Sequence, residues 1–347
     1  MLDLTSASFL GFRHASAELG GWDRLTTGRP AALDEPPAAA AVAGRVARTQ
    51  GAAAGVVHRS TLHALGDVIE LERPDAVVVD AAAYPFAELA AARVLLGGRG
   101  QLATFAHHDA ADARRVVARS GGRVLLLTDG WCGGCNHPAP LLELEALARR
   151  CGGVLLVDDT QALGVLGHRG AGGPPFGRGG GGTFAWLGGR PGAAVLVASL
   201  AKAYGAPLAV TSGPGGTVAR LRTIGTRVHA SPPSAVDLLA ARAATGDPGG
   251  NERRRARLGR LVLAVRAALR RLRLPVLGLP FPVVHTRGPT PESTRRLHAR
   301  LLAQGVRALL LAPRCLPAVT LSLALRADLD PRAAEEVAAA LAAATGR

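Results

Sequence analysis

The sequence predicts an α/β protein with a mostly parallel central sheet in a large domain and a smaller α+β domain at the C-terminus. Its middle part alternates short β-like runs with helical stretches rich in Ala, Leu and Arg, the pattern of a parallel sheet covered by helices. A glycine-rich break at Gly246–Asn251 then indicates a boundary. At 347 residues and 48% hydrophobic composition, the chain can bury a sizeable core.

Five short apolar runs are the expected strands of the large domain. Their length and their Val and Leu content favour strands buried on both faces. The runs are Ala76–Asp80, Arg123–Thr128, Val154–Asp158, Ala194–Ser199 and Leu208–Thr211. The helices expected beside them are Ser60–Glu70, Phe86–Leu96, Ala110–Ser120, Leu141–Cys151 and Gly215–Gly225. In such a sheet, functional groups lie at the carboxyl ends of the strands.

The stretch after the glycine-rich break predicts the smaller domain. A long Arg/Leu/Ala helix is expected first, followed by two β-like runs that alternate with helices. These elements are a strand at Val283–His285, a helix at Pro291–Gln304, a β-like run at Ala318–Leu325 and a helix at Pro331–Ala343. A second glycine-rich stretch, Gly170–Gly192, is expected to be a flexible loop ahead of the fourth strand.

A formal net charge of +15 could indicate a nucleic-acid-binding protein, but the distribution of the charged residues argues against this function. Arginines are spread along the chain and cluster only at Arg253–Arg257 and Arg270–Arg273, and aromatic residues amount to 3%. An acidic partner such as coenzyme A or a carrier protein is compatible with this charge. No apolar run is long enough to cross a bilayer, and no charged-then-apolar leader appears among the first residues of the sequence. We expect a soluble, cytoplasmic protein without nucleic acid or membrane partners.

Lys202 is the single lysine among 41 basic residues. An arginine can replace lysine wherever a solvated charge suffices, but its guanidinium stays protonated and cannot act as a nucleophilic amine. Lys202 is therefore a candidate for covalent chemistry. Chance survival in an arginine-rich composition is the alternative, and the neighbouring residues decide between the two.

Three features are expected to meet at the strand ends: Val157–Asp159, Ser199–Lys202 and a helix start at His58–Thr61. Pyridoxal 5'-phosphate (PLP) needs a lysine amine, a carboxylate that keeps its ring nitrogen protonated, and a helix N-terminus for its phosphate. Each requirement has a candidate here. Taken singly, Asp158 could cap a turn and Ser199 could be an ordinary strand-end hydroxyl, so the interpretation depends on their joint occurrence.

With these residues in place, the chain resembles the α-oxoamine synthase branch of fold-type I PLP enzymes, which includes 8-amino-7-oxononanoate synthase, glycine C-acetyltransferase and serine palmitoyltransferase. The segments that carry the resemblance are Leu2–Gly11, Leu25–Gly28, Thr128–Gly130 with Ala139–Leu141, Val157–Gly170 and Ser199–Gly205. It implies the PLP-dependent transferase fold of the aspartate aminotransferase type. The domains would be 31–245, which binds PLP, and 246–347, with residues 1–30 packing against the smaller one.

The resemblance also implies roles for single residues. Lys202 would form the Schiff base with PLP and move protons at the substrate α-carbon, while Asp158 would pair with the ring nitrogen. Ser199 would bind the phosphate together with backbone amides near Arg59 and Ser60. The implied reaction is condensation of an amino acid with an acyl thioester of coenzyme A or a carrier protein.

Two further positions bear on the ring and on assembly. Tyr84 falls where the family has a histidine stacked on the ring, and an aromatic side chain can stack equally well. Ser231 lies in a segment that resembles the one reaching the phosphate in the neighbouring subunit. The resemblance therefore implies a homodimer with shared active sites.

The substrate side departs from the family pattern. Gln161 stands where a histidine would contact the ring hydroxyl or the substrate, and Gly133 where a serine is expected. The arginine that binds the substrate carboxylate should fall near Ser322, so Arg314 or Arg326 would have to supply it from a shifted position. An aminotransferase or another PLP reaction on an atypical substrate is therefore an alternative.

A competing motif is Trp131–Cys135, followed by Ala139–Pro140, which resembles the redox segment of thioredoxin. A CxxC pair at a helix start can exchange disulfides. A redox or non-catalytic protein that uses Cys132 and Cys135 is the alternative from a different class.

Zinc held by Cys132, Cys135 and His137 is the remaining interpretation of this motif. The second half of a four-ligand site is not evident, because Cys151 and Cys315 are isolated in the sequence. We therefore expect no metal site.

Overall fold

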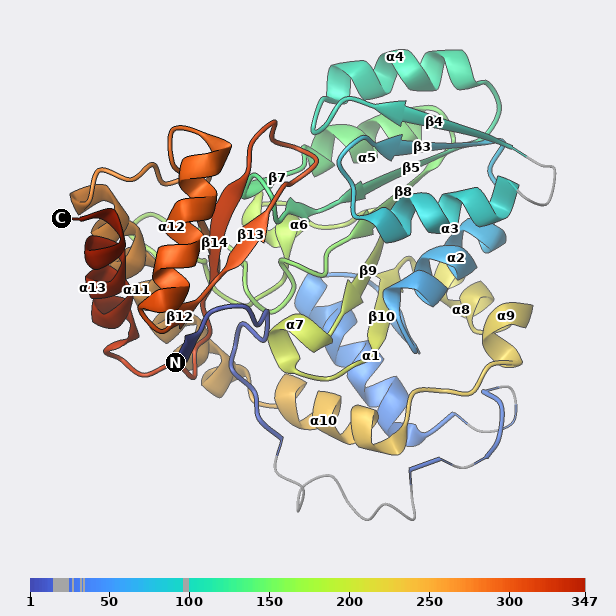
Figure 1. The fold of residues 1–347 in the computed structure, drawn as a ribbon. Coiled ribbons are helices and arrows are strands. Elements are labelled where there is room, and N and C mark those ends of the chain that lie inside the picture. The colour runs from blue at the N-terminus through green and yellow to red at the C-terminus, as the bar shows by residue number, and fades with distance from the viewer. Residues whose placement is uncertain (15–24, 27, 32, 34, 96–99, 347) are drawn as a thin grey trace.

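The computed structural model describes residues 1–14, 25, 26, 28–31, 33, 35–95 and 100–346, and its centre is a seven-stranded sheet (Figure 1). The strand order is β2 (Ala54–His58), β10 (Ala209–Gly213), β9 (Val195–Ser199), β8 (Val154–Asp158), β5 (Val124–Asp129), β3 (Ala76–Asp80) and β4 (Gln101–Phe105). Strand β10 runs antiparallel to both of its neighbours, and the other pairings are parallel. The predicted α/β class with a mostly parallel central sheet is confirmed.

Helices cover both faces of this sheet, because its central strands are apolar on both sides. In β3, Val77 and Val79 pack with α2 (Thr61–Glu72), α3 (Pro85–Leu95) and α8 (Gly215–Leu221). The alternate residues Ala76 and Val78 pack with α4 (Ala110–Ser120) and α5 (Leu141–Arg150). Residue 96, the predicted end of the helix at α3, lies outside the described residues.

A third apolar cluster joins the N-terminal segment to helices beside the central sheet and to the C-terminal part of the chain. It contains Leu4 and Phe9, residues of α1 (Pro37–Gln50) and α10 (Ala235–Thr245), and residues of the C-terminal part. Strand β1 (Leu2–Asp3) pairs in parallel with β12 (Val306–Arg307). This one cluster therefore spans the N-terminal segment, the helices beside the central sheet and the C-terminal part, and the division into domains stays a prediction.

The C-terminal part is a three-stranded antiparallel sheet covered by helices, at the left of Figure 1. Its order is β11 (Val283–Thr286), β14 (Thr320–Ala324) and β13 (Leu309–Leu311). The helices are α11 (Pro248–Arg271), α12 (Pro291–Ala303) and α13 (Ala333–Thr345). The predicted break at residues 246–251 is the start of α11, where Asp247 is the N-cap and Pro248 occupies the first turn.

The glycine-rich stretch 170–192 differs from the expected flexible loop. It packs onto the core through buried Phe176, Phe184 and Trp186 and contains the short helix α6 (Thr183–Trp186). A Cβ on Gly167, just before the stretch, would lie 1.9 Å from the carbonyl oxygen of Arg178. Glycine at this position permits two backbone segments to lie in direct contact. From composition alone, the same glycine-rich stretch is interpreted as a flexible loop.

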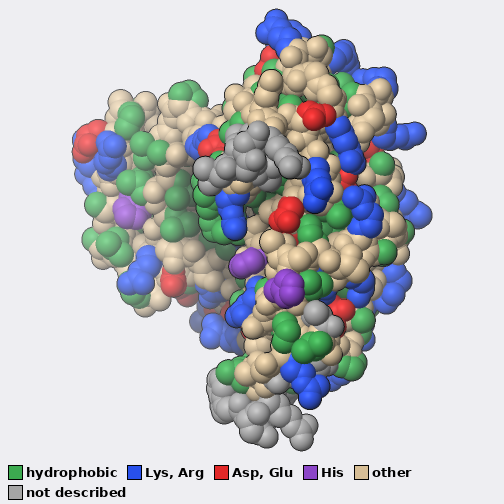
Figure 2. All heavy atoms as spheres, turned by 90° about the vertical axis from the view of Figure 1, so that its right-hand side faces the viewer, with side chains coloured by type: hydrophobic (Ala, Val, Ile, Leu, Met, Phe, Trp, Pro, Cys, Tyr) green, Lys and Arg blue, Asp and Glu red, His purple; other side chains and the backbone are tan. Residues whose placement is uncertain are grey.

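Arginine side chains are dispersed over the face drawn in Figure 2, with acidic side chains among them. None of the helices in the described ranges combines the length and the apolar character that crossing a bilayer requires.

Candidate active site

Polar side chains collect at one edge of the central sheet, where the parallel strands end. Asp129 at the end of β5 is in register with Asp158 at the end of β8. On the other side, Ser199 at the end of β9 is in register with Ala209, which in turn faces His58 at the end of β2. The three predicted motifs therefore meet at this edge, as expected for the carboxyl ends of strands in an open α/β sheet.

Lys202 lies in the short helix α7 (Ala201–Tyr204), which follows β9 immediately. Its Nζ is 6.0 Å from the centre of the Tyr84 ring. Burial lowers the pKa of Lys202, while the carboxylates of Asp158 and Asp129 oppose this effect. The backbone carbonyl of Lys202 accepts a hydrogen bond of 2.8 Å from the amide of Phe9, so the N-terminal segment holds the lysine turn.

Asp158 and Asp129 are neighbouring buried carboxylates. Asp158 accepts a hydrogen bond of 2.9 Å from the amide of Thr160, and burial raises its pKa. Burial, together with the adjacent Asp158, also raises the pKa of Asp129 well above its usual value. Two neighbouring buried carboxyl groups are poorly solvated, so a cationic group bound against them would stabilise their ionised forms.

Asp129 was not a predicted site residue, although it ends an apolar strand in the Thr128–Gly130 motif. Its two oxygens accept hydrogen bonds of 3.2 and 3.1 Å from the amide of Tyr84. This interaction positions the turn that presents the Tyr84 ring, which is 51% exposed and can therefore accept a stacked ligand.

Gln161 and Gly133 face each other beside this edge. A Cβ on Gly133 would lie 3.1 Å from Nε2 of Gln161, so the glycine leaves room for the glutamine. Within the described part of the chain, Oε1 of Gln161 is buried without a hydrogen-bond partner. A buried acceptor of this kind is suited to a donor from a bound ligand.

The helix start near Arg59 has the features of an anion site. Ser60 is the N-cap of the 12-residue helix α2, and its side chain accepts a hydrogen bond from the amide of His63. Ser199 accepts a hydrogen bond of 3.2 Å from the amide of Ala201. Arg59 and Ser231 line the same pocket.

The two candidate arginines for the substrate carboxylate have different surroundings. Arg314, in the loop between β13 and β14, bonds Oε1 of Glu88 at 2.5 Å and the carbonyl of Ala83 at 3.4 Å, next to Tyr84. Arg326 bonds Asp328 at 3.0 Å and the carbonyl of Asp3 at 3.1 Å. Its side chain is only 13% exposed, so its donors stabilise the N-terminal segment.

At the position expected for the family arginine, Ser322 belongs to a neutral network. Its hydroxyl bonds Nδ1 of the buried His285 at 2.8 Å, and Nε2 of His285 bonds the carbonyl of Gly133 at 2.8 Å. Burial lowers the pKa of His285. The sequence does not single out His285, because its partners are 37 and 152 positions away.

The strand order and the polar residues at the strand ends define the fold class, which is the fold-type I architecture of PLP-dependent transferases. Residues 54–341 match the family described as aminotransferase class I and II, and the chain belongs to this family. The family prediction is therefore confirmed.

Curated relatives carry the names that the resemblance implied. The chain is 31% identical over 224 residues to a putative 8-amino-7-oxononanoate synthase of Thermosynechococcus vestitus, covering 64% of this chain and 55% of the relative. It is 35% identical over 130 residues to an 8-amino-7-oxononanoate synthase of Geobacter metallireducens, covering 37% and 33%. The chain therefore spans about half the length, or less, of these relatives.

Solved structures share the fold at low sequence identity. Serine palmitoyltransferase of Sphingomonas wittichii matches with a TM-score of 0.83 at 17% identity, covering 99% of this chain and 87% of that one. A serine palmitoyltransferase solved with PLP as its internal aldimine matches with a TM-score of 0.82 at 16% identity. The 8-amino-7-oxononanoate synthase of Francisella tularensis matches with a TM-score of 0.76 at 15% identity, covering 100% and 97%.

Proposed function

We propose that this protein is a PLP-dependent α-oxoamine synthase-like transferase that condenses an amino acid with an acyl thioester. The observation that carries the proposal is the position of Lys202, the single lysine, at the sheet edge shared with Asp158 and below the Tyr84 ring. The named relatives support the same group of reactions.

The residues at this edge fit PLP. Asp158 is placed to pair with a protonated ring nitrogen, whose positive charge would favour the ionised carboxylate that burial alone disfavours, and the free acceptor of Gln161 suits the ring hydroxyl. The N-terminus of α2 with Ser60, together with Ser199, suits the phosphate. When bound, PLP supplies an electron sink for negative charge at the substrate α-carbon.

Each of these side chains has its own role in the proposed reaction. The neutral amine of Lys202, favoured by burial, takes and returns the proton at the substrate α-carbon. Asp158 would keep the ring nitrogen protonated, and Asp129 positions the Tyr84 turn by accepting hydrogen bonds from its amide. Tyr84 covers one face of the ring and shields it from water.

Substrate recognition is proposed for Arg314, because it lies beside the Tyr84 turn and 44% of its side chain is exposed, whereas only 13% of the Arg326 side chain is. A guanidinium there can bind a carboxylate. The net charge of +15 favours an acyl donor that carries negative charge, such as coenzyme A or a carrier protein. We also propose a homodimer with shared active sites, which rests on the resemblance of the Ser231 segment; within the single chain, Ser231 lines a pocket together with Arg59.

Borohydride trapping tests the cofactor assignment without an activity assay. The protein is incubated with PLP, reduced with borohydride, digested and examined by mass spectrometry. We expect the pyridoxyl group on Lys202, which is the one side-chain amine of this type in the sequence. Lys202→Arg keeps the charge and should lose the modification; an unmodified wild-type Lys202 would contradict the proposal.

A second candidate function, transamination, follows from the neutral network of Ser322, His285 and Gly133 where the family arginine is expected. The two reactions differ in what happens to the amino acid alone in deuterated water. The condensing enzyme exchanges the α-hydrogen and leaves the amino acid intact until a thioester is added. An aminotransferase instead releases a keto acid in proportion to enzyme.

A further inference from the structure

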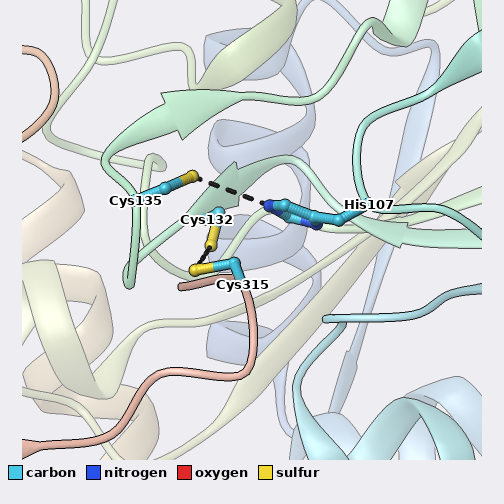
Figure 3. A group of neighbouring side chains, drawn as sticks. All are labelled: His107, Cys132, Cys135 and Cys315. Atoms are coloured by element: carbon cyan, nitrogen blue, oxygen red, sulfur yellow. Dashed lines mark hydrogen bonds between the residues drawn. The ribbon is translucent and has the colours of Figure 1, made fainter. Parts of the chain in front are cut away.

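Three cysteines and a histidine from distant parts of the chain meet beside the active site. Cys132 and Cys135 lie in the hairpin β6–β7 (Trp131–Cys132 and His137–Pro138), His107 follows β4, and Cys315 lies in the loop between β13 and β14 (Figure 3). One ligand atom from each of the four side chains lies within 4.8 Å of all the others. The four side chains point toward a common centre.

We propose that His107, Cys132, Cys135 and Cys315 bind a structural zinc ion. Zinc takes four ligands in a tetrahedron with bonds of about 2.3 Å to sulfur and 2.0 Å to nitrogen, which places neighbouring ligand atoms about 3.5–3.8 Å apart. The sulfurs of Cys132 and Cys315 are 3.4 Å apart, and the sulfur of Cys135 is 3.6 Å from Nε2 of His107. The cluster therefore has the ligand types of a Cys3His zinc site and, in these two pairs, distances close to those of such a site.

The chain also holds these ligands in the orientation that a metal requires. Nδ1 of His107 bonds Oδ1 of the buried Asp80 at 2.7 Å, which turns Nε2 toward Cys135. A carboxylate behind the histidine in this way fixes the ring and its tautomer at many zinc sites. The amide of Gly134 also donates a hydrogen bond of 3.4 Å to the sulfur of Cys132.

A disulfide explains the cluster less well. All four cysteines are free thiols, and a disulfide between Cys132 and Cys315 would require their sulfurs to approach to about 2.05 Å. Such a bond would also leave the Cys135 thiol and the His107 nitrogen facing each other without a shared function. A tetrahedral set of three sulfurs and one nitrogen favours zinc among the common metals.

The proposal departs from the expectation of no metal site, and its ligands differ from the set of Cys132, Cys135 and His137 considered from the sequence. His137 is exposed, and its Nδ1 bonds the carbonyl of Cys135 rather than joining the ligands. Cys315, isolated in the sequence, reaches Cys132 across 183 positions. The fold supplies two ligands, Cys315 and His107, that spacing along the chain cannot indicate.

The zinc ion would hold the C-terminal part against the active-site hairpin. Cys315 lies in the loop that also carries Arg314, and Cys132 and Cys135 flank Gly133, whose carbonyl bonds His285. All four metal positions are filled by protein, which is the pattern of a structural site. The effect on the substrate side depends on the proposed function, whereas zinc binding itself does not.

Metal analysis of the purified protein tests the proposal. We expect about one zinc ion per chain by inductively coupled plasma mass spectrometry, and Cys315→Ser should lose it to a chelator that leaves the wild type loaded. Cys151→Ser is the matched control, because this half-buried cysteine bonds the carbonyl of Ala148 away from the cluster. His137→Ala controls for a histidine beside the site. Both controls should retain zinc.

Cobalt substitution and Asp80→Asn keep the test decisive if Cys315→Ser fails to fold. Cobalt(II) in the wild type should show thiolate charge-transfer bands and the d–d bands of a tetrahedral site. Asp80→Asn should weaken zinc binding by about 10–100-fold. Protein that holds no zinc and gives no tetrahedral cobalt spectrum would overturn the proposal, as would a disulfide involving Cys132 or iron in place of zinc. Borohydride trapping at Lys202 is read separately, so failure of one proposal is not mistaken for failure of the other.

Discussion

At the scale of single residues, two adjacent aspartates at the end of β8 have separate tasks. Asp158 faces Lys202. Asp159 is buried and accepts hydrogen bonds from the Thr183 hydroxyl at 2.6 Å and from the Thr183 amide at 3.2 Å. The sequence pattern shows both residues but not this division. Only the fold brings Thr183, 24 positions away, to Asp159.

Asp158→Asn should impair the proposed chemistry while the fold persists. An amide has nearly the same shape but carries no charge to keep a ring nitrogen protonated, so the α-carbon is less acidic. We expect α-hydrogen exchange to fall by about 10²–10⁴-fold, measured by proton NMR in deuterated water. Asp330→Asn, at an exposed carboxylate, should exchange at the wild-type rate. Equal rates in the two variants would argue against the assigned role.

Asp159 should make stability depend on pH. Burial raises its pKa to about 7, so its stabilising contribution is complete below the unfolded value near 4 and is lost as the pH rises through about 7. Asp159→Asn keeps the acceptor for Thr183 without the charge. As the pH rises through this window, the free energy of unfolding of Asp159→Asn should therefore increase relative to that of the wild type, by at most about 1.4 kcal/mol per pH unit. Urea titrations at several pH values measure the difference, and a pH-independent difference would contradict the prediction.

At the scale of elements, the sequence predicts the interior of the central sheet and misses its two edges. The five predicted strands are central and apolar on both faces. In strand β4 the polar residues Gln101 and Thr104 interrupt the apolar run, and Gln101 and Leu102 are exposed, as expected at the edge of a sheet. Strand β2 contains Gly55, where a Cβ would lie 2.6 Å from the carbonyl of Ala43 in α1; glycine is required by packing but weakens the strand pattern.

The N-terminus of α2 should bind phosphate, and Ser60→Ala tests this. The substitution removes an N-cap, which costs about 1 kcal/mol of stability, and should raise the dissociation constant for PLP more than that for pyridoxal, which lacks the phosphate. Ser234→Ala is the matched control, because Ser234 caps α10 through the amide of Asp237. Titrations followed by absorbance give both constants. If Ser60→Ala weakened both ligands equally, the phosphate would not be bound at this helix.

At the scale of the whole molecule, the contacts that complete the site join segments from both ends of the chain. The amide of Phe9 bonds the carbonyl of Lys202, and the carbonyl of Phe9 accepts from the amide of Ala327. His285 reaches Gly133 from the C-terminal sheet. A single sequence indicates cofactor residues through local motifs, but it contains no signal for pairings over such separations. Local motifs therefore indicate Lys202 and Asp158, whereas His285 and Cys315 have no local signal. Asp129 does stand in a local motif, Thr128–Gly130, but only its hydrogen bonds with the amide of Tyr84 show its role.

Gly134 controls how closely the C-terminal part approaches the active-site hairpin. A Cβ there would lie 2.6 Å from the sulfur of Cys315 and 2.7 Å from Cβ of Pro313, so Gly134→Ala must displace the loop that contains both. We expect a loss of about 1–3 kcal/mol in the free energy of unfolding and weaker zinc retention. In contrast, Gly216→Ala, in α8 with open space around its Cα, should be neutral or stabilising by up to about 1 kcal/mol. Thermal unfolding and zinc analysis of the two variants separate the contributions: a stability loss with full zinc retention would mean that the loop moves without opening the metal site.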